Sequence, residues 1–250
     1  MHLRLIRHAT LIVDYAGQKI LVDPMLDDVA ARPPIENSPN PRKNPLVPLP
    51  MPAEEAIRGV TAVLVTHTHS DHWDSMAAKL LPKHLPLFGQ PEDENKFRSQ
   101  GFKELRPVTT AATWNGIEFT RTECQHGTGD IGAKMAPASG FVFEAQGEPS
   151  FYIAGDTVWC RGVAETIRDF QPKITVVNAG AAQFLQGDPI TMTADCVVNV
   201  CRSAINAQVV AVHMEAINHC LLTRTDLAFQ LESARVRAQV AIPNDGESVQ

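Results

Sequence analysis

Residues 65 to 74 read VTHTHSDHWD and directly follow an apolar run that predicts a buried strand. Three of the nine histidines of the chain and two aspartates lie in this stretch. Alternate side chains of an extended chain point the same way, so His67 and His69 leave the strand end on one face. A turn toward a helix then lets Asp71 and His72 face a neighbouring point. The pattern H-x-H-x-D-H therefore predicts two half-sites for metal ions.

Two bound metal ions need more than four protein ligands, and three other strand ends each offer one. His126 follows the predicted strand that ends at Cys124, Asp156 follows an apolar run at 150 to 154, and His213 closes another run. In each case a strand delivers one histidine or aspartate into a loop, where a rigid scaffold can hold it. Four strand ends of the same design predict one shared site.

The pattern along the chain predicts two sheets packed face to face with helices outside, a mixed α/β architecture. We expect strands at 3–6, 11–15, 19–22, 60–65, 85–88, 104–108, 117–123, 140–145, 150–154, 173–177 and 208–213. We expect helices at 75–81, 91–99, 162–170, 193–205 and 225–235. The first three strands should form an antiparallel meander.

One segment has no predicted regular element. Residues 31–52 hold eight of the 18 prolines, which lack the backbone donor and fix φ. We interpret residues 1–250 as a single domain with this proline-rich segment as a loop insertion. Whether the segment is a plain surface loop or a lid and pocket wall stays open.

Composition argues against several classes of protein. The formal charge of −6 and the lack of a Lys/Arg cluster do not favour a nucleic-acid partner. The five cysteines are scattered without a CxxC, as is typical of reduced thiols. The sequence contains neither a membrane-length apolar run nor a signal peptide, so we expect a cytoplasmic protein that does not enter a membrane.

Taken together, these motifs resemble the metallo-β-lactamase-fold superfamily. The resemblance covers nearly the whole chain and rests on His67, His69, Asp71, His72, His126, Asp156 in AGDT, and His213. The opening HATLIVDYAGQKILVDP, with His8, also looks like the lactonase-like branch that includes ascorbate-6-phosphate lactonases.

The resemblance implies a four-layer αββα sandwich with two divalent metal ions at one edge of the sheets. Zinc is the expected metal, and manganese and iron are alternatives because imidazole and carboxylate ligands accept all three. The implied ligands are His67, His69 and His126 for the first metal, Asp71, His72 and His213 for the second, and Asp156 as the bridge. Asp71 would also act in catalysis by orienting the attacking water or passing on its proton.

Three residues are candidates for substrate contacts. His8 lines the site if the branch resemblance holds, and Asn218 and His219 lie in the loop after His213. Asp74 has two alternative roles, which are to accept a hydrogen bond from a ligating histidine or to cap the helix that follows it.

We therefore predict a dinuclear hydrolase that uses a hydroxide shared by both metals on a small ester, lactone or phosphorylated metabolite. The alternatives are a phosphodiesterase or nuclease of the same fold, and an oxygenase of this fold with one iron. The expected partner is a small molecule, and assembly into a homo-oligomer stays open.

Overall fold

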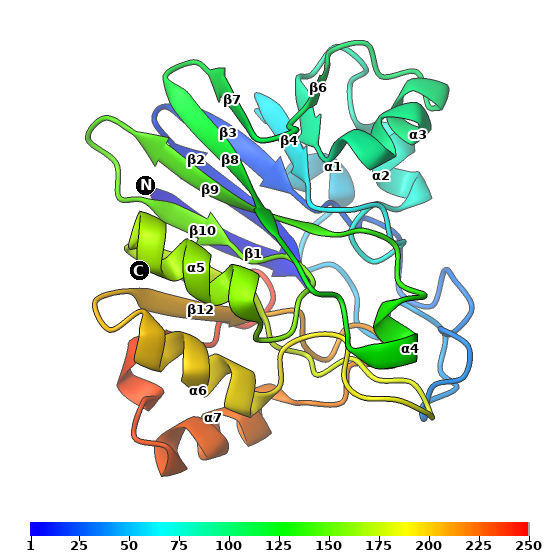
Figure 1. The fold of residues 1–250 in the computed structure, drawn as a ribbon. Helices are drawn as coiled ribbons and strands as arrows, with labels where there is room; N and C mark the ends of the chain where they lie inside the picture. The colour runs from blue at the N-terminus through cyan, green and yellow to red at the C-terminus, as the bar shows by residue number, and fades with distance from the viewer. Residues whose placement is uncertain (250) are drawn as a thin grey trace.

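The computed structural model describes residues 1–249, which form two seven-stranded sheets that pack face to face with helices outside (Figure 1). The predicted αββα sandwich is confirmed. The first sheet has the order β14 (Ser248–Val249), β1 (His2–Arg7), β2 (Thr10–Tyr15), β3 (Gln18–Val22), β4 (Ala62–Val65), β5 (Leu87–Gly89) and β6 (Leu105–Pro107). The second has the order β13 (Val240–Ala241), β12 (Gln208–Val212), β11 (Ile174–Asn178), β10 (Phe151–Ile153), β9 (Ser139–Ala145), β8 (Ile117–Glu123) and β7 (Ala111–Trp114).

Each sheet is antiparallel in one half and parallel in the other. Strands β1, β2 and β3 form the predicted meander, and β3 to β6 run parallel. In the second sheet β7 to β10 are antiparallel neighbours, and β10 to β13 run parallel. As a result β1, β3 and β4 end at one edge of the first sheet, and β8, β10, β11 and β12 end at one edge of the second.

Helices cover the outer face of each sheet (Figure 1). On the first sheet these are α1 (Ala53–Ala56), α2 (Ser75–Leu80) and α3 (Glu94–Ser99), with a 3-10 turn at Pro91–Asp93 before α3. On the second they are α5 (Arg161–Phe170), α6 (Ala194–Ser203) and α7 (Arg224–Ser233). Helix α4 (Gly129–Gly132) lies in the loop after β8, and a second 3-10 turn spans Arg237–Gln239. Among the described residues, no helix has the length and apolar character needed to cross a bilayer.

Burial on both faces explains the continuous apolar runs of the parallel strands. In β4, Ala62 and Leu64 pack between the two sheets, whereas Val63 and Val65 pack under the helices. The layer between the sheets is rich in phenylalanine, and Phe88 stacks on Phe119 with ring centroids 4.6 Å apart. This rigid sandwich fixes the strand ends that carry the histidines and aspartates.

Several short elements differ from the sequence expectation, among them three strands. Strand β7 was not predicted, because its side chains are only half buried or exposed and show no clear apolar face. Asn115 and Gly116 form the turn that joins it to β8, and both have positive φ, as a tight hairpin requires. Strands β13 and β14 have only two residues each, which is too short for an apolar pattern in the sequence. They are strands because they pair with β12 and β1.

Candidate metal centre

Strand ends from both sheets converge on one cluster of histidines and aspartates. The turn after β4 carries His67, His69, Asp71 and His72; His126 follows β8, Asp156 follows β10, and His213 follows β12. Their ligand-type atoms form three overlapping groups, each with all atoms within 4.8 Å of one another: His67, His69 and His126; His67, His72 and Asp156; and His8, Asp71, His72 and His213. All seven predicted ligand residues therefore lie at one place.

The first half of the cluster consists of three imidazoles. His67 Nε2 lies 2.9 Å from His69 Nδ1, and His126 Nε2 lies 3.3 Å from the same Nδ1 atom. His69 therefore faces the cluster through Nδ1, and the other two face it through Nε2. Three nitrogen atoms at these distances have the arrangement of a three-histidine metal site.

The second half combines two imidazoles with a carboxylate. His72 Nε2 and His213 Nε2 are 3.1 Å apart, and Asp71 Oδ2 lies 3.5 Å from His213 Nε2. All three side chains are buried. A carboxylate and two histidines form a second donor set that suits a divalent transition metal.

Asp156 lies between the two halves. Its Oδ2 atom is 3.8 Å from His67 Nε2, 3.5 Å from His126 Nε2 and 3.3 Å from His72 Nε2. Its Oδ1 atom lies 3.4 Å from His213 Nε2 and accepts a hydrogen bond from Asn178 Nδ2 at 2.6 Å. The Asp156 carboxylate therefore has at least one oxygen atom facing each half of the cluster.

Hydrogen bonds outside the cluster fix which ring nitrogen carries a proton. His126 Nδ1 lies 2.9 Å from the Ile190 carbonyl oxygen, which can only accept, so Nδ1 is protonated. Thr66 donates its single hydroxyl proton to Asp23 Oδ2, so its oxygen accepts from His67 Nδ1 at 3.1 Å. The Nε2 lone pairs of His67 and His126 therefore point into the cluster, where they face only His69 Nδ1, and three imidazole nitrogens that face one another fit a cation.

The pKa shifts of the clustered side chains also indicate that the cluster suits a cation. Burial alone would lower the pKa of His72, but Asp156, Asp23 and Asp71 outweigh it and raise that pKa well above its ordinary value. Burial would raise the pKa of Asp71, but His72 and His213 hold it well below the usual range. The pKa of His67 is well below normal, chiefly because of burial. The three carboxylates therefore favour positive charge at the centre of the cluster.

The backbone is strained at several of these strand ends. His8, Asp23 and His213 have φ of 62°, 44° and 69°, a region that residues other than glycine seldom adopt. The amide of His213 donates to the carbonyl oxygen of His8 at 2.9 Å, which ties the end of β12 to the end of β1 in the other sheet. The strain places both imidazoles at the cluster, with ring centroids 3.6 Å apart.

The predicted substrate contacts have different surroundings. His8 is buried, and its Nε2 lies 3.2 Å from Asp71 Oδ2. The Asn218 side chain bonds to the proline-rich segment at Ile35, Ser38, Asn40 and Asn44, which leaves it little capacity for a substrate. His219 is buried beside Phe184, with ring centroids 5.9 Å apart. Their roles toward a substrate stay predictions.

The sequence left two roles open for Asp74, and the structure gives one to Asp74 and the other to Asp23. Asp74 accepts the backbone N–H of Ala77 at 2.7 Å and caps α2, and its other oxygen accepts from Asp27 N. Asp23, which sequence reasoning missed, lies 2.8 Å from His72 Nδ1. The signal was present, because Asp23 directly follows β3 at the same edge as the other strand ends.

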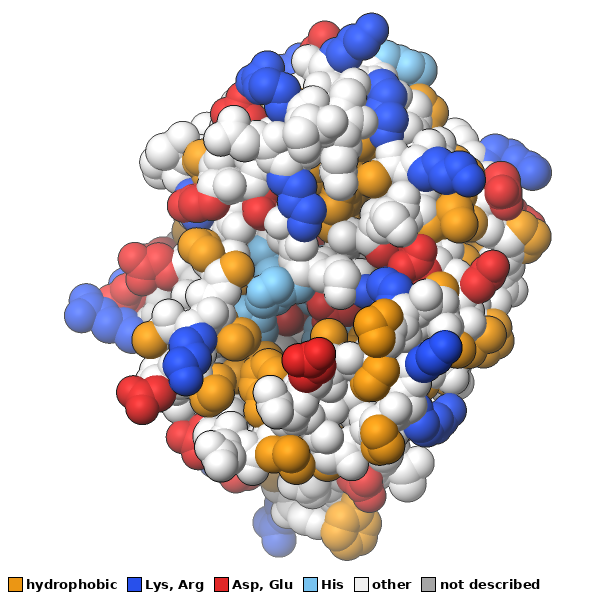
Figure 2. All heavy atoms as spheres, turned by 90° about the vertical axis from the view of Figure 1, so that its right-hand side faces the viewer, with side chains coloured by type: hydrophobic (Ala, Val, Ile, Leu, Met, Phe, Trp, Pro, Cys, Tyr) orange, Lys and Arg blue, Asp and Glu red, His pale blue; other side chains and the backbone are white. Residues whose placement is uncertain are grey.

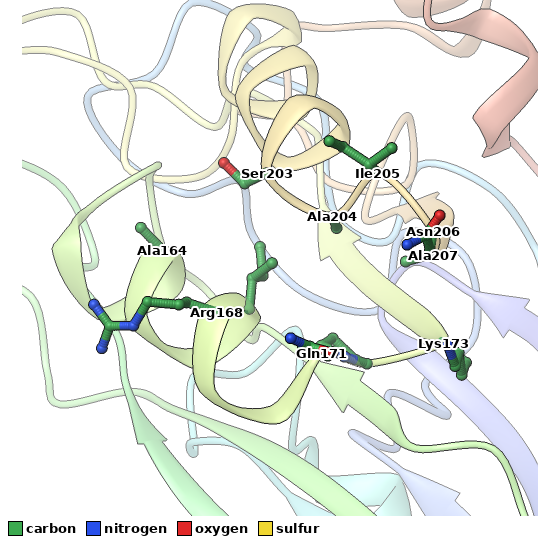
Figure 3. A pocket seen from close by; sticks show the side chains of 11 residues that line it. Ala164, Arg168, Gln171, Lys173, Ser203, Ala204, Ile205, Asn206 and Ala207 are labelled. Atoms are coloured by element: carbon green, nitrogen blue, oxygen red, sulfur yellow. The ribbon is translucent and has the colours of Figure 1, made fainter.

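The cluster opens to solvent in a hollow. Figure 2 shows histidine side chains at its floor and a rim of mixed apolar and charged side chains, on the face where the strands end. A cavity of about 430 Å³ lies next to His126, lined by residues 124–129 and several residues from 132 to 138, none of which has a charged acidic or basic side chain. Another cavity, of about 480 Å³, lies between the carboxyl ends of α5 and α6 (Figure 3). Its lining includes no histidine, cysteine, aspartate or glutamate, so it is not part of the cluster.

Comparison with known proteins agrees with this geometry. Residues 18–214 match the family model described as a β-lactamase superfamily domain. UPF0173 protein YddR from Bacillus subtilis is 36% identical, with 99% of each chain covered. A UPF0173 metal-dependent hydrolase from Azorhizobium caulinodans is 27% identical over 96% of each chain.

Two solved structures superimpose over the whole chain. An isothiocyanate hydrolase from Delia radicum gut bacteria has a TM-score of 0.94 and 37% identity, covering 100% of this chain and 99% of that one. A possible metal-dependent hydrolase from Veillonella parvula has a TM-score of 0.96 and 34% identity, covering 100% and 98%. The superfamily expectation is confirmed, whereas the lactonase-like branch stays a prediction. The chain belongs to the β-lactamase superfamily, in its UPF0173 group of metal-dependent hydrolases.

Proposed function

We propose that the cluster is a dinuclear centre that hydrolyses a small molecule. His67, His69 and His126 would hold one metal ion, Asp71, His72 and His213 the other, and Asp156 would bridge them. The observation that carries this proposal is the position of Asp156, whose Oδ2 faces His67, His126 and His72 while its Oδ1 faces His213. Zinc suits this donor set, and manganese and iron are the alternatives.

When bound, divalent ions at this point supply an activated water and polarise the group that it attacks. Residues of the chain would position this water and accept its proton. Asp71 stays ionised because its pKa is held low, so it can accept a hydrogen bond from water or a proton. His8 Nε2, at 3.2 Å from Asp71 Oδ2, would help to hold that carboxylate in position.

The sequence suggests a small ester, lactone or phosphorylated metabolite as the substrate. The structural neighbour named as an isothiocyanate hydrolase adds one more electrophilic carbon compound as a candidate. In that reaction water oxygen bonds to the central carbon and the carbon–nitrogen bond breaks. Both water protons go to nitrogen, so the products are an amine and carbonyl sulfide.

The test is a panel assay on protein reconstituted separately with zinc, manganese and iron. We expect about two metal ions per chain and turnover of lactones, esters, thioesters or isothiocyanates. His67→Ala should lose metal at one position, Asp156→Ala at one or both, and both variants should fall to background activity. Cleavage of phosphodiesters alone would favour the nuclease alternative, and one iron per chain with oxygen consumption would overturn the hydrolase proposal.

The expected partner and location follow from the same features. A net charge of −6 suits a small-molecule enzyme better than a nucleic-acid-binding protein. We propose a cytoplasmic location on the reduced state expected for the five cysteines, all of which are free in the structure. Assembly into a homo-oligomer stays a prediction, which sedimentation of the purified protein would test.

A further inference from the structure

We infer that His219 is a substrate-binding residue that selects an uncharged molecule with an apolar substituent. This inference rests on the proposed function, because it assumes that the hollow beside the metal centre receives the substrate. It adds to that function a contact outside the ligand set and a chemical class of substrate.

The side chain of His219 is buried yet lacks a hydrogen-bond partner. Its exposed fraction is 6%, and its Nδ1 atom has no partner among the described residues. An orphaned polar atom in the interior costs free energy, so such atoms in native proteins normally meet a ligand or a water. The loop is fixed from outside, because Gln183 N donates to the His219 carbonyl oxygen at 2.9 Å. The ring is therefore held in place with its hydrogen-bonding capacity unused.

His219 lies beside the metal centre without belonging to its ligand groups. The next residue, Cys220, has its Sγ atom 3.6 Å from His213 Nδ1, so the His219 loop lies beside the second half, and none of the three ligand groups includes His219. Burial lowers its pKa to about 4, so near neutral pH the ring is uncharged. A neutral imidazole offers one N–H donor and one acceptor, which suits a polar uncharged atom better than an anion.

Two exposed leucines close to His219 in the sequence favour an apolar substituent. Leu185 and Leu221 have exposed fractions of 66% and 43%, although side chains of this kind are usually buried. Leu221 is two residues from His219, and Leu185 follows Phe184, which packs against the His219 ring. Apolar side chains form part of the rim of the hollow in Figure 2, beside charged ones. Exposed apolar groups beside a polar centre mark a ligand site.

Two cations close to the turn after β4 already have carbonyl or carboxylate partners. Lys96 Nζ donates to the Thr68 carbonyl oxygen at 2.8 Å, and Arg32 pairs with Asp27 through Nε and donates to the Ser70 carbonyl oxygen through Nη1, so that only Arg32 Nη2 has no partner among the described residues. One guanidinium nitrogen does not supply the several charge-assisted bonds that phosphate recognition uses. The geometry therefore favours the uncharged members of the substrate panel.

The test compares His219→Phe and His219→Gln with His84→Gln, a change at an exposed histidine. All variants should keep the metal content of the wild type. His219→Phe should lower kcat/KM for uncharged alkyl substrates by about ten- to a hundred-fold, the effect of one lost hydrogen bond. His219→Gln, which keeps a donor and an acceptor, should stay within several-fold. For the wild type, kcat/KM should rise with alkyl chain length and be lower for phosphorylated analogues.

A second readout does not depend on turnover. Nitrogen-15 NMR of the His219 ring, in metal-loaded protein, should shift on addition of N-propylacetamide, an inert uncharged amide, and not on addition of inorganic phosphate. Unchanged kcat/KM in His219→Phe, loss of metal in that variant, or no shift with the amide would each overturn the inference. A wild type that binds the amide at His219 but hydrolyses nothing would instead overturn the proposed function.

Discussion

Residues that are not ligands set the direction of the histidine rings. Asp23 accepts three hydrogen bonds, from the Thr66 backbone, the Thr66 hydroxyl and His72 Nδ1. Through Thr66 it also fixes the orientation of His67, so one carboxylate controls a ring in each half of the cluster. Such outer contacts keep lone pairs aimed at the metal and raise the basicity of the ligand.

Replacing this carboxylate should weaken metal binding without unfolding the protein. We expect Asp23→Asn to reduce zinc affinity by about ten- to a hundred-fold, because the amide has one acceptor oxygen and no charge. Competition with a coloured chelator measures this. Asp14→Asn, at a half-exposed carboxylate on β2, is the matched control and should leave affinity unchanged. Equal affinities in both variants would show that Asp23 does not support the ligands.

The raised pKa of His72 predicts proton release on metal binding. Burial lowers that pKa, but Asp156, Asp23 and Asp71 raise it well above its ordinary value, so in metal-free protein the ring is protonated at neutral pH. A metal needs the lone pair that this proton occupies, so binding expels it. Affinity should therefore increase with pH, by about tenfold per unit for one proton, until the pH passes the pKa of His72.

Calorimetric titration of zinc into chelator-stripped protein measures this release. We compare two buffers of different ionisation enthalpy at pH 7. If one proton is released, the apparent binding enthalpies should differ by the difference between the two ionisation enthalpies. The His72→Gln variant, which cannot hold that proton, should release fewer protons. Identical enthalpies in both buffers for the wild type would contradict the assignment.

At the scale of elements, the sequence predicted most of the strands and selected seven residues that the fold brings together, whose roles as ligands stay predictions. This was feasible because these histidines and aspartates follow apolar runs of sequence. Such runs form buried parallel strands, whose carboxyl ends lie at one edge of a sheet. Sequence reasoning considered Asp74 and missed Asp23 as the partner of a histidine, because the contact between Asp23 and His72 depends on the pairing of β3 with β4. It also missed β7, although Asn115-Gly116 is a strong hairpin signal.

The proline-rich segment is hydrogen-bonded to Asn218, and we predict that it acts as a pocket wall. Replacing residues 33–50 by a short Gly/Ser linker should change the order of preference among substrates while metal content stays at the wild-type level, because none of the clustered ligands lies in the segment. Metal analysis and kcat/KM across the substrate panel test this. Asn218→Ala should shift preference in the same direction but less. Loss of metal from the deletion variant would mean that the segment supports the fold instead.

At the scale of the whole molecule, the metal centre joins the two sheets. His67, His69, Asp71 and His72 come from the first sheet, and His126, Asp156 and His213 come from the second. Each half of the cluster takes ligands from both, since His126 completes the first and His213 the second. Bound metal therefore connects the ends of strands whose other contacts are apolar side chains between the sheets.

Metal should accordingly raise the thermal stability of the whole sandwich. A ligand that binds only the folded state at a hundred times its Kd adds about 2.7 kcal/mol, which for a chain of this size corresponds to about 5–10 °C in Tm. Differential scanning calorimetry of zinc-loaded and chelator-stripped protein measures the difference. His213→Ala should lose part of the increase, and His84→Gln, at an exposed histidine, should keep all of it. Equal Tm values with and without metal would show that the ions do not join the sheets, because linkage requires any ligand of the folded state to stabilise it.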